Sequence, residues 1–200
     1  EQWKLENATL ISETKQLQES VAHIREIVSR QQSLSGKLGI DENINISDLI
    51  NNCLSFYVTN FKNAKIIVSM NNEPGLEWNG DRSKITQILL NLIMNSEESL
   101  IASSNQPKTL KITSFNNKND GIQIEVADNG AGIEPEVLNK LFSYGFTTKP
   151  FGHGLGLHAS AIAANEMGGT LQAFSSGKDK GATFILTLPK QPVSSNTVNV

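Results

Sequence analysis

The stretch Asp128-Asn129-Gly130-Ala131-Gly132 follows residues 122–126, where apolar and polar side chains alternate as in a half-buried strand. The predicted strand therefore ends on a carboxylate, and a turn of small residues comes next. Gly130 and Gly132 can adopt backbone conformations that other residues avoid, and they let a ligand approach the main chain. A carboxylate only accepts hydrogen bonds, so Asp128 suits a ligand that offers an amino group. Taken alone, the pattern favours a tight turn without a ligand.

A second glycine-rich stretch, Gly152-His153-Gly154-Leu155-Gly156-Leu157, leads into a helical pattern that reaches Met167. Free backbone N–H groups and the helix dipole make a helix N-terminus an anion site, and the small Gly154 and Gly156 would let phosphates reach it. His153 and His158 are either phosphate donors or ordinary loop and helix residues, and His153 is the better candidate. Two glycine-rich turns, one behind a strand and one before a helix, indicate a nucleotide site.

Length and composition set the class of protein. Two hundred residues of ordinary composition predict one domain with an appendage, or two small domains. The formal net charge of −3, without a basic block, argues against nucleic acid as a partner. No apolar run approaches a membrane span, so we expect no direct membrane contact and a cytoplasmic location, with an anchor elsewhere in a longer protein left open. The chain starts with Glu, which suggests a fragment.

The lone cysteine, Cys53, excludes an internal disulfide and fits a reducing compartment. It lies inside a helical pattern, which favours a buried small hydrophobe over a nucleophile.

Residues 1–38 are predicted to form a helical dimerisation segment. Trp3, Leu10, Leu17 and Ile24 recur every seven residues, and Val21 and Val28 occupy complementary positions. Past Ile24 the apolar stripe widens, as in a four-helix bundle. A single long helix docked on its own domain is the alternative. Residues 191–200 are predicted to be a flexible tail.

Between these ends, the pattern alternates helices and strands. After a break at residues 39–45, we expect a helix capped by Ser47 that runs through Phe61, and later a helix capped by Asp81 that runs to Leu100. A short helix opens at Pro135 and ends near Leu141, and another covers 155–167. Strands are predicted at 65–70, 76–78, 110–115, 121–126, 170–174 and 183–188, with 110–115 and 121–126 forming a hairpin.

Three polar groups are candidate ligand contacts, each with a structural alternative. Asn91 and Asn95 share one helix face, where an amide oxygen could bind a hard cation or the pair could bond to a loop. Thr147, Thr148 and Lys149 follow an aromatic stretch and suit phosphate oxygens, or form an exposed polar loop. Thr183 is either a ligand contact or a strand former.

Together these stretches resemble the ATP-binding catalytic domain of sensor histidine kinases, within the superfamily shared with gyrase, the Hsp90 chaperones and the MutL proteins. The resemblance covers roughly residues 41–190. Residues 81–100 resemble the asparagine box, and 128–133 the first glycine box. Phe142, Phe146 and residues 147–149 resemble the phenylalanine box, and 152–157 the second glycine box.

The resemblance implies a cofactor and a set of roles. Asp128 would accept from the adenine amino group, Asn95 would hold Mg²⁺, and Asn91 would stand near the phosphates of ATP. The candidate catalytic residues are Asn91, Asn95 and Lys149, with Asn95 as the metal ligand. The candidate nucleotide-binding residues are Asp128, Gly130, Gly132, Ile133, Phe142, Thr147, Thr148, Gly152, His153, Gly154, Leu155, Gly156, Leu157 and Thr183. Gly130 and Gly132 would make room for the base, and residues 146–152 would form a small lid.

The implied fold is α+β: a two-layer α/β sandwich, with a mixed sheet covered by helices on one face, preceded by the long N-terminal helix. This agrees with the alternation of half-buried strands and amphipathic helices. The expected domains are the helical segment 1–38, an ATP-binding domain at 39–190 and the tail 191–200.

The segment from Gln18 to about Leu38 resembles the second helix of the kinases' dimerisation and phosphoacceptor domain, and residues 23–32 are the part that looks alike. The family's phosphoacceptor histidine lies on the first helix, followed by an acidic residue and usually a proline. His23 is followed by Ile24 and Arg25, with no proline before Pro74, so that role is not transferred to His23. The first helix is expected upstream, and this fragment would bind ATP without phosphorylating itself.

The resemblance therefore implies a histidine kinase that forms a homodimer through its N-terminal helix and passes the phosphoryl group to the receiver domain of a response regulator. An ATP-driven conformational ATPase of the chaperone or mismatch-repair type is an alternative. Such ATPases use Glu at the first asparagine-box position, where this chain has Asn91. A nucleotide-binding scaffold without kinase activity and a serine kinase of anti-sigma type are further alternatives.

Overall fold

The computed structural model of the protein describes residues 41–117, 121–149, 152 and 154–190. The chain divides into two compact units, residues 39–148 with 152–200 and residues 1–38 with 149–151, and the fold below is that of the first unit. The predicted helix 1–38, His23, His153 and the tail 191–200 lie outside the described residues.

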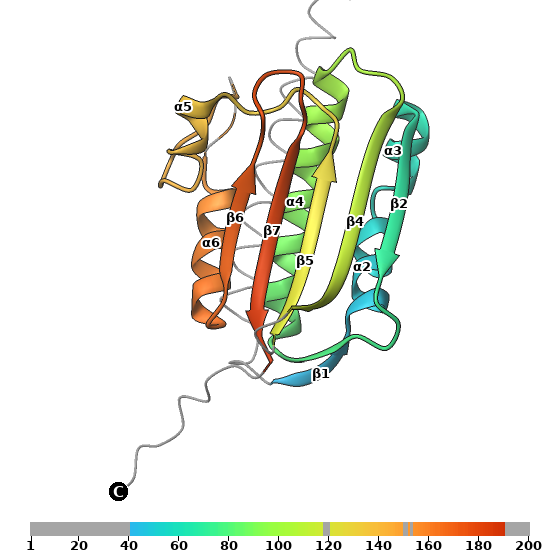
Figure 1. The fold of residues 1–200 in the computed structure, drawn as a ribbon, viewed down its shortest axis with the longest axis vertical. Helices are drawn as coiled ribbons and strands as arrows, with labels where there is room; N and C mark the ends of the chain where they lie inside the picture. The colour runs from blue at the N-terminus through green and yellow to red at the C-terminus, as the bar shows by residue number, and fades with distance from the viewer. Residues whose placement is uncertain (1–40, 118–120, 150–151, 153, 191–200) are drawn as a thin grey trace, which may run out of the picture. The chain divides into compact units, whose positions relative to one another are not determined.

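A five-stranded mixed sheet forms one layer of this unit, in the order β2-β4-β5-β7-β6 (Figure 1). The strands are β2 (Ile66–Asn72), β4 (Lys108–Asn117), β5 (Gly121–Asp128), β6 (Thr170–Phe174) and β7 (Ala182–Pro189). β2 runs parallel to β4, and the other neighbours are antiparallel. β4 and β5 form the predicted hairpin, with Leu110 opposite Asp128.

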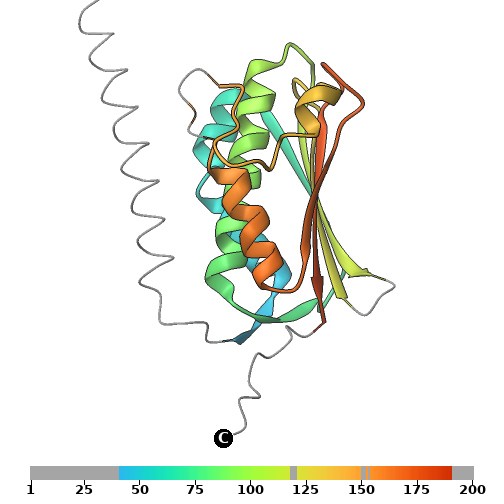
Figure 2. The same ribbon diagram turned by 90° about the vertical axis from the view of Figure 1, so that its left-hand side faces the viewer.

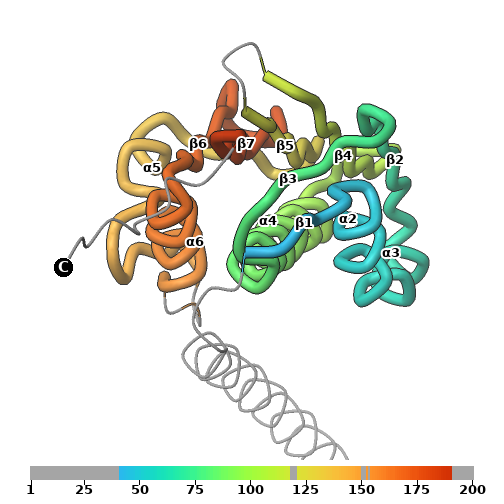
Figure 3. The backbone as a smooth tube through the Cα atoms, turned by 90° about the horizontal axis from the view of Figure 1, so that it is seen from below, coloured from blue at the N-terminus to red at the C-terminus, as the bar shows by residue number. Residues whose placement is uncertain are grey.

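Helices cover one face of this sheet, which gives the second layer (Figures 2 and 3). They are α2 (Ile46–Ser55), α3 (Val58–Ala64), α4 (Arg82–Ala102) and α6 (Gly156–Glu166). The predicted two-layer α+β arrangement is confirmed. None of the helices in the described part of the chain combines the length and the hydrophobicity that a bilayer span requires.

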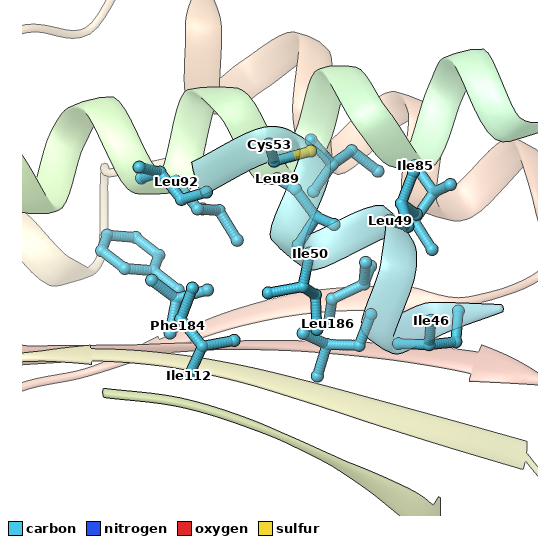
Figure 4. Close-up of a cluster of buried hydrophobic side chains, with 14 of the residues drawn as sticks. Ile46, Leu49, Ile50, Cys53, Ile85, Leu89, Leu92, Ile112, Phe184 and Leu186 are labelled. Atoms are coloured by element: carbon cyan, nitrogen blue, oxygen red, sulfur yellow. The ribbon is translucent and has the colours of Figure 1, made fainter. Parts of the chain in front are cut away.

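The hydrophobic core lies between the two layers (Figure 4). Leu89 and Leu92 of α4 are fully buried there, as are Ile112 of β4 and Leu186 of β7. Side chains of a strand alternate between its faces, so Ile122, Ile124 and Val126 of β5 all point toward the helices. Burying one such side chain stabilises the fold by roughly 1.5–3 kcal/mol.

Cys53 belongs to this core, as predicted. It is 1% exposed, and burial raises the pKa of its thiol to about 11. A thiol held in its neutral form packs as a small apolar side chain and is a poor nucleophile.

The start of α2 differs from the prediction. The helix begins at Ile46, and its cap is Asn45, whose side-chain oxygen accepts from the backbone N–H of Asp48 at 3.0 Å. Ser47, the predicted cap, already lies inside the helix. The backbone N–H of Ile46 donates to the carbonyl of Leu76 at 3.0 Å, and this tertiary contact fixes where the helix starts.

Other boundaries also differ. The predicted break at residues 39–45 contains a short strand, β1 (Glu42–Asn45), which pairs antiparallel with β3 (Glu77–Gly80). The predicted single helix through Phe61 is interrupted at Phe56 and Tyr57, where α2 ends and α3 begins. The helix that opens at Pro135, α5 (Pro135–Leu138), stops short of Leu141. Asp81 is confirmed as the cap of α4, and its side chain accepts from the N–H groups of Ser83 and Lys84.

Candidate nucleotide-binding site

A cavity of about 360 Å³ opens where β5 ends and β7 begins. Its wall combines the ends of β5 and β6, the start of β7, α5 and the loop that joins β6 to β7. The lining residues are Asp128, Leu138, Ala173, Phe174, Ser175, Ser176, Lys180, Gly181, Ala182 and Thr183. Asp128, the carboxylate that ends β5, is therefore brought to a hollow that a small molecule could enter.

The carboxyl group of Asp128 is buried, with 8% of the residue exposed. Its Oδ1 accepts hydrogen bonds from Ser99 Oγ at 3.0 Å and from the backbone N–H of Gly130 at 2.9 Å. Its Oδ2 is buried too, and it has no hydrogen-bond partner among the described residues. Burial raises the pKa of Asp128 above its ordinary value, and the bonds from Gly130 and Ser99 oppose that rise.

A buried acceptor without a partner is costly, typically by about 1–3 kcal/mol, unless a ligand supplies the missing donor. The free Oδ2 of Asp128 is thus an unsatisfied group beside a cavity. An amino group from a bound molecule would satisfy it.

The first glycine turn packs tightly against the protein itself. A Cβ at Gly130 would overlap Ser99 of α4, and one at Gly132 would overlap the carbonyl of Gly177. Gly132 also has φ +70°, a conformation that favours glycine. The structure therefore explains both glycines by close approach of α4 and the β6–β7 loop, whereas their predicted role of making room for a base stays a prediction.

Side chains outside the predicted set hold this turn in place. Asn105 Nδ2 donates to the carbonyl oxygens of Asn129 at 2.9 Å and of Asp179 at 3.0 Å. Ser175 Oγ accepts from the N–H of Ile133 at 2.9 Å and donates to the carbonyl of Gly181 at 2.6 Å. The turn and the β6–β7 loop are thereby joined into one wall of the cavity. Ile133 itself packs against the core.

Asn91 and Asn95 meet the second glycine stretch. Asn91 Nδ2 donates to Ser160 Oγ of α6 at 2.8 Å, and Asn95 Nδ2 lies 3.4 Å from Asn91 Oδ1. Gly156, the first residue of α6, lies against the same Asn91 side chain. A Cβ added at Gly156 would be 2.5 Å from Asn91 Oδ1. The structure therefore places both asparagines of α4 beside the N-terminus of α6, where Leu155 is the cap residue and Leu157 packs against the core.

The aromatic stretch before this turn is fastened to α6. Phe142 packs against the core, and its carbonyl oxygen lies 2.8 Å from Nδ1 of His158. The exposed ring of Tyr144 packs edge-on against the His158 ring. His158 therefore anchors the loop from α6, which is the ordinary helix role that the sequence left open. A Cβ at Gly154, with φ +64°, would overlap Gly145 and Phe146, so the two segments lie side by side.

For the remaining candidate site residues, the structure gives their exposure and their position. Thr147 and Thr148 follow Phe146, half-buried and exposed respectively, and Gly152 is half-buried. Lys149 belongs to the second compact unit. Thr183 lines the cavity, although the alternation of β7 puts its neighbour Ala182 on the face that carries Asp128.

Comparison with known proteins settles the family. The model of the histidine kinase-, DNA gyrase B- and HSP90-like ATPases matches residues 80–192, which is more than half of the chain and includes α4, both glycine turns and β7. The chain belongs to this ATPase family. Its ATP-binding domain is therefore the unit that carries the cavity and Asp128.

Relatives of this ATPase domain include sensor kinases. The chain is 32% identical to the sensor histidine kinase ZraS of Escherichia coli K12 over 147 residues, which cover 73% of this chain and 30% of ZraS. It is 39% identical to the sensor protein FixL of Bradyrhizobium diazoefficiens over 109 residues, 54% of this chain and 21% of FixL. The chain thus spans less than a third of either relative.

Solved structures agree with the fold of the ATPase domain. The nucleotide-free catalytic domain of the histidine kinase ThkA superposes with a TM-score of 0.67 at 28% identity, covering 76% of this chain and 97% of that domain. The ThkA kinase in complex with the response regulator protein TrrA matches with a TM-score of 0.68 at 24% identity, over 86% of this chain and 49% of ThkA.

Proposed function

We propose that this chain is the catalytic part of a sensor histidine kinase, which transfers the γ-phosphoryl group of ATP to a histidine outside this domain, for relay to an aspartate of a response regulator. The observation that carries the proposal is the buried Oδ2 of Asp128, an acceptor beside a cavity that finds no hydrogen-bond partner in the described part of the chain. That oxygen fits the amino group that distinguishes adenine from guanine at the same ring position.

The residues of α4 and α6 would act on the other end of the nucleotide. Bound Mg-ATP would supply the phosphoryl group and a metal ion that neutralises phosphate charge. Asn95 would give an amide oxygen to Mg²⁺, which prefers oxygen ligands, and Asn91 would stand beside the phosphates. The backbone N–H groups at the start of α6 would donate to the phosphate oxygens, because the cap residue Leu155 makes no side-chain hydrogen bond to them.

Kinase chemistry is preferred over rapid ATP hydrolysis because of Asn91. Its amide donates to Ser160 and cannot take a proton from water. A hydrolysing enzyme needs a base within reach of the attacking water. The similarity to ZraS and FixL, both sensor proteins by name, supports the same choice.

The partners belong to the same proposal. The heptad pattern of residues 1–38 supports a homodimer through that segment. A response regulator is proposed as the downstream partner, since the similar kinase ThkA was solved with the regulator TrrA.

A two-part experiment tests the function. Calorimetry of the 200-residue chain with Mg-ADP should show binding that Asp128→Ala removes. Glu125→Ala, which deletes a carboxylate from the neighbouring part of β5 on its opposite face, should leave binding unchanged. Asn95→Ala should mainly remove the dependence of binding on Mg²⁺.

Labelled ATP should then be offered to this chain and to one extended toward the N-terminus. We expect label on a histidine of the longer chain only. If the chain binds no adenine nucleotide, or if the longer chain hydrolyses ATP without retaining label, the kinase proposal is wrong.

A further inference from the structure

Ser99 connects the acidic group of the cavity to the turn that follows it. It lies on α4, and its hydroxyl donates to Asp128 Oδ1 at 3.0 Å. Ser99 Oγ also accepts a hydrogen bond from the backbone N–H of Ala131 at 3.1 Å. The backbone carbonyl of Ser99 accepts from the same N–H at 3.2 Å. Ser99 is thus bonded at once to the carboxylate and to the glycine turn, from a different element of the fold.

The contact is possible only because residue 130 is glycine. A Cβ at Gly130 would overlap both the hydroxyl and the backbone of Ser99. The close approach brings two donors, the Ser99 hydroxyl and the Gly130 N–H, to one oxygen of the carboxylate.

Two donors on one oxygen determine how the carboxylate is turned. The last torsion of an aspartate side chain is broad and nearly two-fold, so the side chain alone does not choose which oxygen faces a ligand. With Oδ1 occupied by Ser99 and Gly130, Oδ2 is left as the acceptor without a partner. A single donor would fix this orientation less firmly.

We propose that Ser99 is a positioning residue for base selection: its hydroxyl holds the Asp128 carboxylate so that Oδ2 accepts the amino group of adenine and repels the carbonyl of guanine. This inference rests on the proposed nucleotide function. It adds a residue of α4 that touches the carboxylate and the turn, and that acts on the base through them.

The surroundings of Asp128 define what removal of the hydroxyl would do. Four polar groups around the carboxyl oppose the rise in its pKa: the side chains of Ser96 and Ser99 from α4, and the backbone N–H groups of Gly130 in the turn and Ala182 in β7. Lys180 of the β6–β7 loop is the one charged residue besides Asp128 among the residues that line the cavity. Ser99→Ala removes one of the two donors to Oδ1 and leaves the Gly130 N–H, whereas the Ala131 N–H keeps the carbonyl of residue 99. The turn should therefore survive while the carboxylate loses a donor.

Ser114→Ala is a matched control. Ser114 is fully buried on β4, and its hydroxyl donates to Asn72 at 3.0 Å. In the β4–β5 ladder Ser114 pairs with Ile124, whereas Asp128 pairs with Leu110, farther along the same strand. The control removes a buried serine hydroxyl without touching the cavity.

The test measures the binding of Mg-ADP and Mg-GDP by calorimetry over a series of pH values, with urea unfolding to verify each fold. The unmodified chain should prefer Mg-ADP. Ser99→Ala should reduce that preference by about fivefold to tenfold, less than the loss of a direct hydrogen bond to a charged group, because the Gly130 N–H still holds Oδ1. The pH at which Mg-ADP binding is half lost should also rise, because a hydrogen bond to the ionised form has been removed. Ser114→Ala should change neither quantity.

The outcomes separate the two proposals. If Ser99→Ala keeps the preference for Mg-ADP and the pH midpoint of the unmodified chain, the positioning role is overturned and the kinase proposal stands. An unmodified chain that binds both nucleotides equally would overturn the positioning role as well. A chain that binds neither would overturn both. If Ser99→Ala does not fold, Ser99→Cys, which keeps the size but donates weakly, should show the same loss, and retained preference there would reject the inference.

Discussion

Gly156→Ala should separate nucleotide binding from fold stability. Gly156 is the first residue of α6, and it is not among the described glycines with positive φ, so alanine can adopt its backbone conformation. The new methyl group would lie 2.5 Å from Asn91 Oδ1 and 3.1 Å from Asn91 Cγ. Because that neighbour is a side chain and not backbone, Asn91 is the group that must move.

The two effects on stability nearly cancel. Alanine is favoured over glycine in a helix by up to about 1 kcal/mol. Displacing Asn91 breaks its hydrogen bond to Ser160, which at 2.8 Å contributes about 0.5–1.5 kcal/mol. The free energy of unfolding should therefore stay within about 1 kcal/mol of the original value.

Binding should respond differently. With Asn91 displaced and Asn95 losing its neighbour, affinity for Mg-ATP should fall by about tenfold or more, as expected for a lost hydrogen bond to a charged group. Adenosine, which lacks the phosphates, should bind as before because Asp128 is untouched. Urea unfolding and calorimetry measure the two quantities.

Gly75→Ala is the control with the opposite pattern. Gly75 has φ +70° and no atom within 4 Å of an added Cβ, so the change should cost about 1 kcal/mol of stability through backbone strain alone, with Mg-ATP binding unchanged. The reasoning is refuted if Gly156→Ala binds Mg-ATP normally, or if it destabilises the fold by more than about 3 kcal/mol, the range of real overpacking.

Other perturbations test the remaining groups. Binding of Mg-ATP should weaken as the pH falls through the raised pKa of Asp128, because Oδ1 already accepts from two donors and the proton must go to Oδ2; calorimetry showing constant affinity down to the ordinary aspartate range would contradict this. Cys53, with a thiol pKa of about 11 and 1% exposure, should react with a thiol reagent only after urea unfolding, and labelling of the native chain would show that α2 opens. Leu92→Ala should lower the free energy of unfolding by about 2–5 kcal/mol, and a loss below about 1 kcal/mol would mean that the core collapses around the deletion. A chain that starts at Gly39 should sediment as a monomer, since the proposed dimer forms through residues 1–38; a dimer would place the interface on the domain itself.

Regular patterns predicted the layers of the fold. The alternation before Asp128 and the broad apolar face of residues 81–100 both reflect contact with one core, so local sequence carried the information. β1 could not be found this way. Asn43 and Asn45 disfavour a strand, and the segment is extended because β3 pairs with it. Likewise, Asn45 and Ser47 are both good caps, and the choice between them comes from the contact of Ile46 with Leu76.

The candidate site shows the same division. Asp128, Asn91 and Gly156 stood out through composition and spacing, and the structure brings Asn91 and Gly156 into contact. Ser99 and Asn105 did not stand out, because their partners are 29 and 24 residues away and serine and asparagine are common on helices and loops. The glycines were expected to admit a ligand, and that expectation stays a prediction; the structure adds that a Cβ at Gly130 would overlap Ser99 and that one at Gly156 would overlap Asn91. Residue type alone does not tell which kind of neighbour a glycine admits.

The amide of Asn105 has a consequence for how the cavity can change shape. One side chain joins the turn after β5 to the loop between β6 and β7, so these two segments must shift together or remain still. The stretch after α5 is not part of this link, because it is held to α6 instead, through the contact of the His158 ring with the carbonyl of Phe142. In the proposed kinase, the contacts to the base would therefore be able to stay fixed while the stretch after α5 changes its position.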